Sequence, residues 1–141
     1  MPESLIEPTS QYIILKYHSN IISSAGTGTL NYQLQHEPII VDISILEYIN
    51  SNYKYTEIIK SQGDSMLPLI QENSLIFVDT LDKNINSKNI YVVNVKGELF
   101  IKKIVFKDGL YLLRSLNQSY RDIKVKDFNV IGKVKGVLNR V

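Results

Sequence analysis

One serine of this chain stands in a setting that is typical of an exposed nucleophile. Ser65 lies in the segment QGDSMLP, residues 62–68. Gly63 allows the backbone to turn sharply just before the serine, and such a turn can expose the hydroxyl and leave nearby N–H groups free to bind an oxyanion. Because a Gly-Asp-Ser string also occurs in ordinary loops, the segment indicates acyl-transfer chemistry only together with a base.

Few residues could act as this base. The nucleophile elbow of α/β-hydrolases requires a second glycine two positions after the serine, where this chain has Leu67. A Ser-His-Asp triad would have to use His18 or His36. Both lie in the N-terminal region, where the sequence predicts the least structure, so we expect surface histidines without a catalytic role.

Lysine is the remaining base, and Lys102 and Lys103 lie in the apolar segment LFIKKIVF, residues 99–106. Apolar neighbours remove water from an ammonium group and lower its pKa from about 10.4, and only the neutral amine can accept the serine proton. The alternative is that one or both lysines extend along a strand edge into solvent. Strand alternation alone does not distinguish the two lysines, so the residues leave this choice open.

The elements that must position these groups are mainly strands. Two short hairpin turns are predicted at Lys96-Gly97 and Asp108-Gly109, and one short helix over residues 42–49 with Asp42 or Ser44 as its N-cap. The fold class is therefore mostly β: a compact folded antiparallel sheet or barrel with one or two short helices. Runs of β-branched and aromatic residues predict the strands at 55–59, 74–78, 89–95, 99–106, 110–114 and 130–138.

The first 37 residues have a different composition. The stretch SSAGTGT, residues 23–29, holds two glycines separated by one residue, and each glycine costs about 1 kcal/mol in a helix interior. We predict a flexible arm or linker over residues 1–37 and a folded domain over residues 38–141.

Composition excludes several classes of function. With 44% hydrophobic and 21% charged residues, the 141-residue chain matches a folded globular domain. It has no cysteine and two histidines, so we expect no metal site and no cofactor. No run is long and apolar enough for a membrane span, and no secretory signal is present, so we expect a cytoplasmic protein without a membrane partner. The net charge of +2 is too small to predict direct DNA binding.

Two segments together resemble a known family. Gly63-Asp64-Ser65-Met66, followed by Phe100-Ile101-Lys102-Lys103, is similar to the paired boxes of LexA-like peptidases, which include LexA, lambda-type phage repressors and UmuD and are distantly related to signal peptidases. The interval between the boxes also resembles the family's spacing. The resemblance implies the LexA and signal-peptidase type of fold. It also implies Ser65 as nucleophile, Lys102 as general base, and the backbone N–H groups of Ser65 and Asp64 as oxyanion donors.

The resemblance extends to a cleavage site. Family members that cleave themselves cut an Ala-Gly or Cys-Gly bond upstream of the serine, and this chain has Ala25-Gly26 in the arm. Small residues on both sides of the bond would let an extended segment approach Ser65, and attack within one molecule needs no separate substrate.

The implied function is the dimerisation and autocleavage domain of a LexA-like or phage-repressor-like transcriptional regulator. In the family, a RecA filament formed after DNA damage promotes cleavage during the SOS response. The first 40 residues show no helix-turn-helix pattern, so we expect the DNA-reading domain to be absent from this chain. The alternatives are a stand-alone UmuD-like mutagenesis protein and a dimerisation module of the same fold that does not cleave. A signal peptidase is disfavoured by the missing membrane anchor.

Self-association is expected as well. The resemblance implies a homodimer formed through the C-terminal strands, and that region is rich in apolar side chains. The residues we expect at the contact are Val130, Ile131, Val134, Val137 and Leu138.

Overall fold

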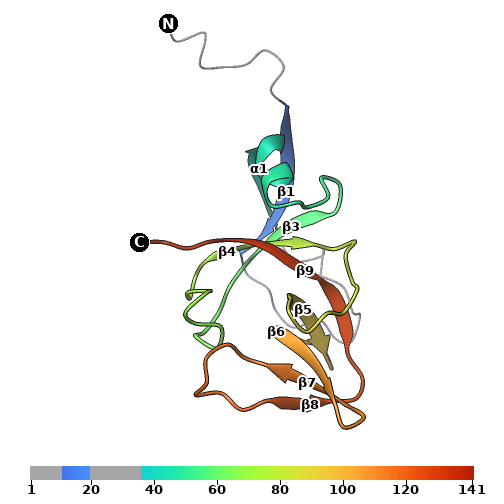
Figure 1. The fold of residues 1–141 in the computed structure, drawn as a ribbon. Helices are drawn as coiled ribbons and strands as arrows, with labels where there is room; N and C mark the ends of the chain where they lie inside the picture. Colours follow the sequence, from blue (N-terminus) through green and yellow to red (C-terminus); the bar gives the residue numbers. More distant parts are fainter. Residues whose placement is uncertain (1–10, 20–35) are drawn as a thin grey trace, which may run out of the picture.

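Strands dominate the computed structural model of this chain, which describes residues 11–19 and 36–141. The described residues form one nine-stranded sheet in the order β2-β1-β3-β4-β9-β5-β6-β7-β8 (Figure 1). The mostly β class and all six predicted strands are confirmed. These six are β3 (Thr56–Lys60), β4 (Leu75–Asp79), β5 (Ile90–Val95), β6 (Glu98–Lys107), β7 (Leu110–Arg114) and β9 (Asn129–Leu138); the others are β1 (Tyr12–His18), β2 (Glu37–Asp42) and β8 (Ile123–Val125).

The strand β9 joins the two parts of the sheet. Its C-terminal half pairs with β4 and its N-terminal half with β5, both antiparallel, with an irregularity of register in each pairing. Figure 1 shows β9 running between the part that holds β3 and β4 and the part that holds β5 to β8. One pairing departs from the expected antiparallel pattern, because β1 and β3 run parallel. The sheet is therefore mixed.

Both predicted hairpin turns are present. Lys96 and Gly97 have φ angles of 51° and 88° between β5 and β6, and Asp108 and Gly109 have 54° and 76° between β6 and β7. Positive φ at both central residues is the signature of the two-residue turn that matches strand twist. These turns fix the register of β6 against both neighbours.

The predicted helix is α1 (Ile43–Tyr48), and of the two candidate caps it uses Asp42. The Asp42 carboxylate accepts a hydrogen bond from the N–H of Ser44 at 2.9 Å, which lowers the pKa of that carboxyl group. Leu46 is the helix residue that is fully buried, and it packs with Leu15 of β1 and Ile58 of β3. The short helix therefore covers one face of the β1 and β3 pair.

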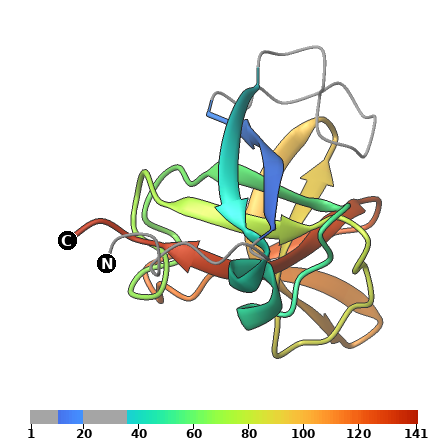
Figure 2. The ribbon, with the colours of Figure 1, turned by 90° about the horizontal axis from the view of Figure 1, so that it is seen from above.

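Part of the predicted arm lies in the sheet. Residues 12–18 form β1, which pairs along its length with β2 and at Tyr17 and His18 with β3 (Figure 2). Alternate side chains of β1 are exposed and covered, and Leu15 is buried. The expectation that His18 is a surface residue is wrong: it is 3% exposed, and its Nε2 lies 2.6 Å from Oε1 of Glu57 on β3. The sheet partners supply the burial that the local sequence did not reveal.

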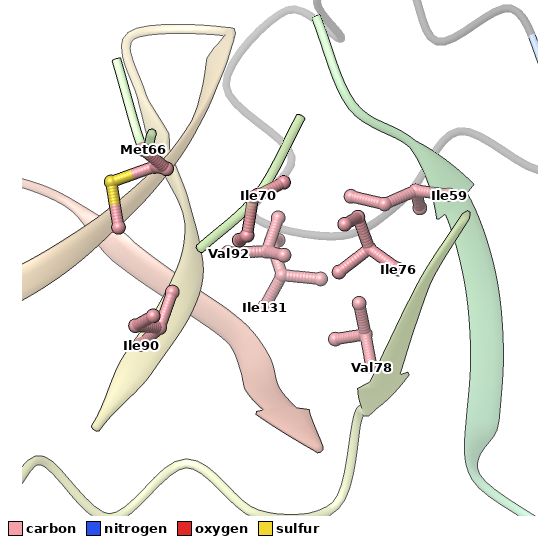
Figure 3. Packing of buried hydrophobic residues seen from close by; sticks show 8 residues of the cluster. All are labelled: Ile59, Met66, Ile70, Ile76, Val78, Ile90, Val92 and Ile131. Carbon is pink, nitrogen blue, oxygen red and sulfur yellow. The ribbon is translucent and has the colours of Figure 1, made fainter. Parts of the chain in front are cut away.

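A hydrophobic cluster lies beneath the loop that carries Ser65. Met66 and Ile70, which follow the serine, are buried against strand residues of β3, β4, β5 and β9 (Figure 3). Since both side chains are inserted in the core, the loop between β3 and β4 is anchored directly after Ser65. The members of the cluster are Ile59, Met66, Ile70, Ile76, Val78, Ile90, Val92 and Ile131.

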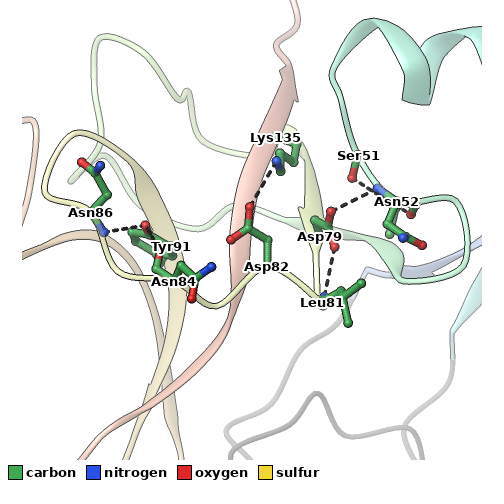
Figure 4. Close-up of polar contacts among 10 residues, drawn as sticks. Ser51, Asn52, Asp79, Leu81, Asp82, Asn84, Asn86, Tyr91 and Lys135 are labelled. Carbon is green, nitrogen blue, oxygen red and sulfur yellow. Dashed lines mark hydrogen bonds and ion pairs between the residues drawn. The ribbon is translucent and has the colours of Figure 1, made fainter.

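Polar contacts hold the long connection between β4 and β5 (Figure 4). The Asp79 carboxylate accepts hydrogen bonds from the N–H groups of Asn52 and Leu81, each at 3.0 Å. Further along, Asp82 forms an ion pair of 3.3 Å with Lys135 of β9. The connection is thus tied to β9 and to the segment after α1.

Several of the apolar C-terminal residues that we expected at a dimer contact belong to the core. Ile131 is buried in the main cluster, and Val134 and Val137 pack against it. β9 pairs with β4 through residues 133–138 and with β5 through residues 129–133, so among the described residues each half of the strand is paired along one edge and unpaired along the other. The core explains part of the excess of apolar side chains in this strand, whereas Leu138 is exposed. The expected dimer contact through the C-terminal strands stays a prediction.

Within the described ranges, no helix has the length and hydropathy needed to cross a membrane.

Candidate active site

Ser65 lies at a turn that the sequence builds from a glycine and two core anchors. Gly63 has φ +75°, a conformation that side chains disfavour, while nothing lies within 4 Å of where a Cβ would be. The glycine is therefore required by the backbone conformation and not by lack of space. After the turn, the buried side chains of Met66 and Ile70 fix the loop, and Ser65 is left partly exposed.

Lys102 faces the serine from β6. Its Nζ donates a hydrogen bond of 2.6 Å to Oγ of Ser65, and its side chain is 6% exposed. Lys103, the next residue, is partly exposed and shows no contact with Ser65. Successive side chains of a strand point to opposite faces, so only one of the two lysines can reach the serine. The structure thus distinguishes the two lysines, which strand alternation in the sequence did not.

The surroundings of Lys102 disfavour its charge. Burial removes water from the ammonium group and lowers the pKa of Lys102 below the usual value of 10.5. The rings of Phe100 and Tyr120 lie near, with centroids 6.0 Å and 5.8 Å from Nζ. In the part of the chain that the structure describes, the ion pairs do not include Lys102. A lysine in this setting is suited to accept a proton.

The segment between β7 and β8 reaches back to the serine turn, a contact that the sequence analysis did not predict. The N–H of Asn117 donates to the carbonyl of Ser65 at 2.9 Å, and its Nδ2 donates to the carbonyl of Asp64 at 3.0 Å. The hydroxyl of Tyr120 donates to the Asp64 carboxylate, which raises the pKa of Tyr120. No spacing rule connects positions this far apart in the sequence, so only the fold reveals the contact.

A cleft of about 420 Å³ opens beside Ser65 and Lys102. One wall is the end of β3 with residues 60–62, and another is the first half of β6. Because β7 pairs with β6 only from Lys103 onward, residues 98–102 have a strand partner on one edge alone among the described residues. An extended chain could therefore bind along this edge by main-chain hydrogen bonds.

The other predicted site residues have different outcomes. The N–H of Ser65 belongs to the turn, and among residues 11–19 and 36–141 it donates to no acceptor. Ala25 and Gly26 lie outside the described residues. His36 is exposed, with its ring 5.8 Å from that of His18, and neither histidine lines the cleft. Within the described ranges, no three His, Cys, Asp or Glu side chains gather as metal ligands would.

Comparison with known proteins adds two findings. Residues 20–135 match the family described as Peptidase S24-like. The Repressor protein CI of Enterobacteria phage phi80 is 34% identical over 77 residues, which cover 52% of this chain and 33% of the repressor. The aligned part thus spans about a third of that relative's length.

Proposed function

This chain belongs to the Peptidase S24-like family, and from that premise we propose that it is a self-cleaving serine peptidase domain with Ser65 as nucleophile and Lys102 as general base. Family membership and the similarity to a phage repressor confirm the resemblance to LexA-like proteins that the two sequence boxes indicated. The observation that carries the catalytic proposal is the hydrogen bond of 2.6 Å between Nζ of a buried lysine and Oγ of a serine at a glycine turn.

The chemistry begins with a proton transfer. Neutral Lys102 takes the proton of Ser65, and Oγ attacks the carbonyl carbon of Ala25. The oxyanion that forms is stabilised by the backbone N–H of Ser65, together with that of Asp64. Lys102 then returns its proton to the amine of Gly26, the peptide bond breaks, and an acyl-enzyme on Ser65 remains. Water attacks this ester with Lys102 again as base, which releases the new carboxylate and restores the serine.

The position of the arm supports cleavage within one molecule. β1 ends at His18 and β2 begins at Glu37, and the pairing of Tyr17 with Glu37 brings the two ends of the intervening chain together. The segment that holds Ala25 and Gly26 is attached to the sheet at both ends, and His18 at one end pairs with Ile59, which lines the cleft. Such a tether favours attack within one molecule over attack on a separate substrate.

The biological role that fits best is regulatory. The similarity to a repressor supports a role as one domain of a phage-repressor-like transcriptional regulator. In this role the domain would dimerise and cleave itself, with cleavage promoted by a RecA filament after DNA damage, as the family resemblance implies. A UmuD-like protein shares the same fold and chemistry and is the second candidate. A module that dimerises without cleaving is the third.

Incubation of the purified protein distinguishes a self-cleaving domain from a module that does not cleave. We expect protein held at alkaline pH to yield two fragments, with the break after Ala25, when its mass is measured under denaturing conditions. Ser65→Ala is the matched control, and because the hydroxyl packs little, the variant should fold as the parent does. An unbroken parent chain would leave the non-cleaving module as the function, and cleavage of Ser65→Ala at the parent rate would remove Ser65 from the mechanism.

A further inference from the structure

Asn117 holds both peptide groups that flank the nucleophile. Its side chain donates to the carbonyl of Asp64 at 3.0 Å, and its own N–H donates to the carbonyl of Ser65 at 2.9 Å. The first carbonyl belongs to the peptide group before the Ser65 Cα atom and the second to the peptide group after it. One residue from the segment between β7 and β8 therefore contacts the serine backbone on both sides.

These two contacts determine more than the loop's stability. A peptide group is planar and trans, so the direction of its C=O fixes the direction of its N–H. Holding the Asp64 carbonyl therefore aims the N–H of Ser65, which donates to no acceptor in the described part of the chain. Holding both planes also fixes φ and ψ of Ser65, and with them the direction of the Cα–Cβ bond that carries Oγ.

We propose that Asn117 is the positioning residue of this site, which aims the oxyanion-binding N–H of Ser65 and directs its Oγ toward Lys102. The inference rests on the proposed peptidase function and adds to it a residue outside the two sequence boxes. Asn117 touches neither reacting atom, so its effect is exerted through the serine backbone.

Asn117 is itself held in place. Its Oδ1 accepts the N–H of Ser119 at 3.0 Å, and its carbonyl accepts the N–H of Tyr120 at 3.1 Å. The Tyr120 hydroxyl donates to the carboxylate of Asp64. The segment is thus a small folded turn, tied to residue 64 by two side chains, and it can act as a rigid support.

Two substitutions separate the parts of this arrangement. Asn117→Ala removes the donor to Asp64 and the acceptor for Ser119, whereas Asn117→Asp keeps the acceptor, replaces the donor with a carboxylate oxygen and adds a negative charge. Asn139→Asp is the matched control, because Asn139 also donates from Nδ2 to a carbonyl of the same loop, that of Leu69 at 3.0 Å, and accepts the N–H of Gln71 at 3.0 Å. The control loosens the loop without touching the peptide groups of Ser65.

The first measurement is the rate at which a fluorophosphonate labels Ser65, followed by mass across a range of pH. Oγ bonds to phosphorus, fluoride leaves, and Lys102 takes the proton. We expect both Asn117 variants to lower the high-pH plateau by about 10- to 100-fold, because small misplacement of reacting groups has effects of that size. Asn117→Ala should leave the midpoint of the pH profile in place, since the burial of Lys102 is unchanged, and Asn139→Asp should stay within about twofold of the parent.

The second measurement does not depend on activity. In nuclear magnetic resonance spectra of labelled protein, the amide and Cα resonances of Ser65 should move in both Asn117 variants and stay in Asn139→Asp. Parent-like labelling by the Asn117 variants, or Ser65 resonances that do not move in them, would overturn the inference. If the parent protein itself is not labelled at Ser65, the peptidase function fails, and the resonances still decide whether Asn117 positions the serine.

Discussion

At the scale of single residues, Lys102 lies in surroundings that disfavour its positive charge. Its side chain is 6% exposed, and burial lowers the pKa of its amine. Burying an ammonium group without an anionic partner lowers the free energy of unfolding. Such a loss of stability is common at sites whose function requires a side chain with a shifted pKa. Lys102 should therefore lower the stability of the fold while it provides a reactive amine.

Replacing Lys102 with methionine tests whether the buried amine lowers stability and is required for cleavage. We expect Lys102→Met to abolish self-cleavage and to raise the free energy of unfolding by about 1–2 kcal/mol near neutral pH, measured by urea denaturation. The folded-state pKa is lowered, so the penalty is full below that lowered pKa and declines as the pH rises through it toward 10.5. Lys103→Met should change stability by less than about 0.5 kcal/mol and keep cleavage. A less stable Lys102→Met would contradict the burial argument.

The rate of self-cleavage should follow the neutral fraction of Lys102. Raising the pH removes the proton from the amine, so the rate should increase and reach half of its maximum below 10.5, because burial lowers the pKa. Initial rates in a series of buffers, measured by denaturing mass analysis, would give this midpoint. A rate that is constant between about pH 7 and 10 is incompatible with a lysine base.

At the scale of elements, the sequence predicted what local chemistry controls. The turns at both ends of β6 were evident from Lys96-Gly97 and Asp108-Gly109, because glycine adopts positive φ. The strands on either side of these turns were evident from their apolar runs. β1, β2 and β8 were not predicted, because their burial comes from partners. Every second side chain from Tyr12 to Lys16 is exposed, and Leu15 is buried in a cluster to which α1, β2 and β3 also contribute.

The candidate site likewise has residues that the sequence predicted and residues that it did not. The boxes around Ser65 and Lys102 were visible because a family resemblance connects them, and the choice between Lys102 and Lys103 followed that resemblance. Asn117 and Tyr120 were missed because their contacts with Asp64 depend on how the segment between β7 and β8 folds back. No periodicity in the sequence encodes such a contact.

One glycine of β9 tests how closely β9 and β4 pack. A Cβ at Gly132 would lie 2.8 Å from Cγ1 of Val78 and nearer still to the carbonyl oxygen of Asp79. Since both neighbours belong to the sheet, Gly132→Ala should lower the free energy of unfolding by about 2–3 kcal/mol in urea denaturation. Gly109→Ala, where φ is +76° but nothing lies near the Cβ, should lower it by about 1 kcal/mol. Equal effects would mean that β9 moves away easily.

At the scale of the whole molecule, the expected dimer would form through β9, whose residues 134–138 have a strand partner on one edge alone among the described residues. Val137 is partly buried against the core, so Val137→Asp should destabilise the fold, and its effect on association would be uninformative. Leu138 at the end of the same strand is 58% exposed and can be changed without entering the core.

We predict that the protein forms a dimer at tens of micromolar and that Leu138→Asp weakens it, because a charge in an apolar contact is costly. Sedimentation equilibrium should give twice the 16.1 kDa monomer mass for the parent and a lower average for the variant. Leu81→Asp, which changes a leucine that is 57% exposed in the connection after β4, is the control and should remain dimeric. A parent protein of monomer mass throughout would exclude the dimer.

The pairing of β1 has a consequence for the products of the proposed reaction. A break after Ala25 would leave β1 on one fragment and β2 on the other, yet β1 pairs with β2 from Tyr12 to Tyr17 and with β3 at its end. The immediate product is therefore a nicked protein whose two pieces stay interlocked, with the mass of the intact chain under native conditions and two masses after denaturation. Separation requires β1 to leave the sheet, which is a local unfolding step with its own barrier. Bond cleavage and fragment release would then be two events, and a regulator built this way could be cut before it is switched off.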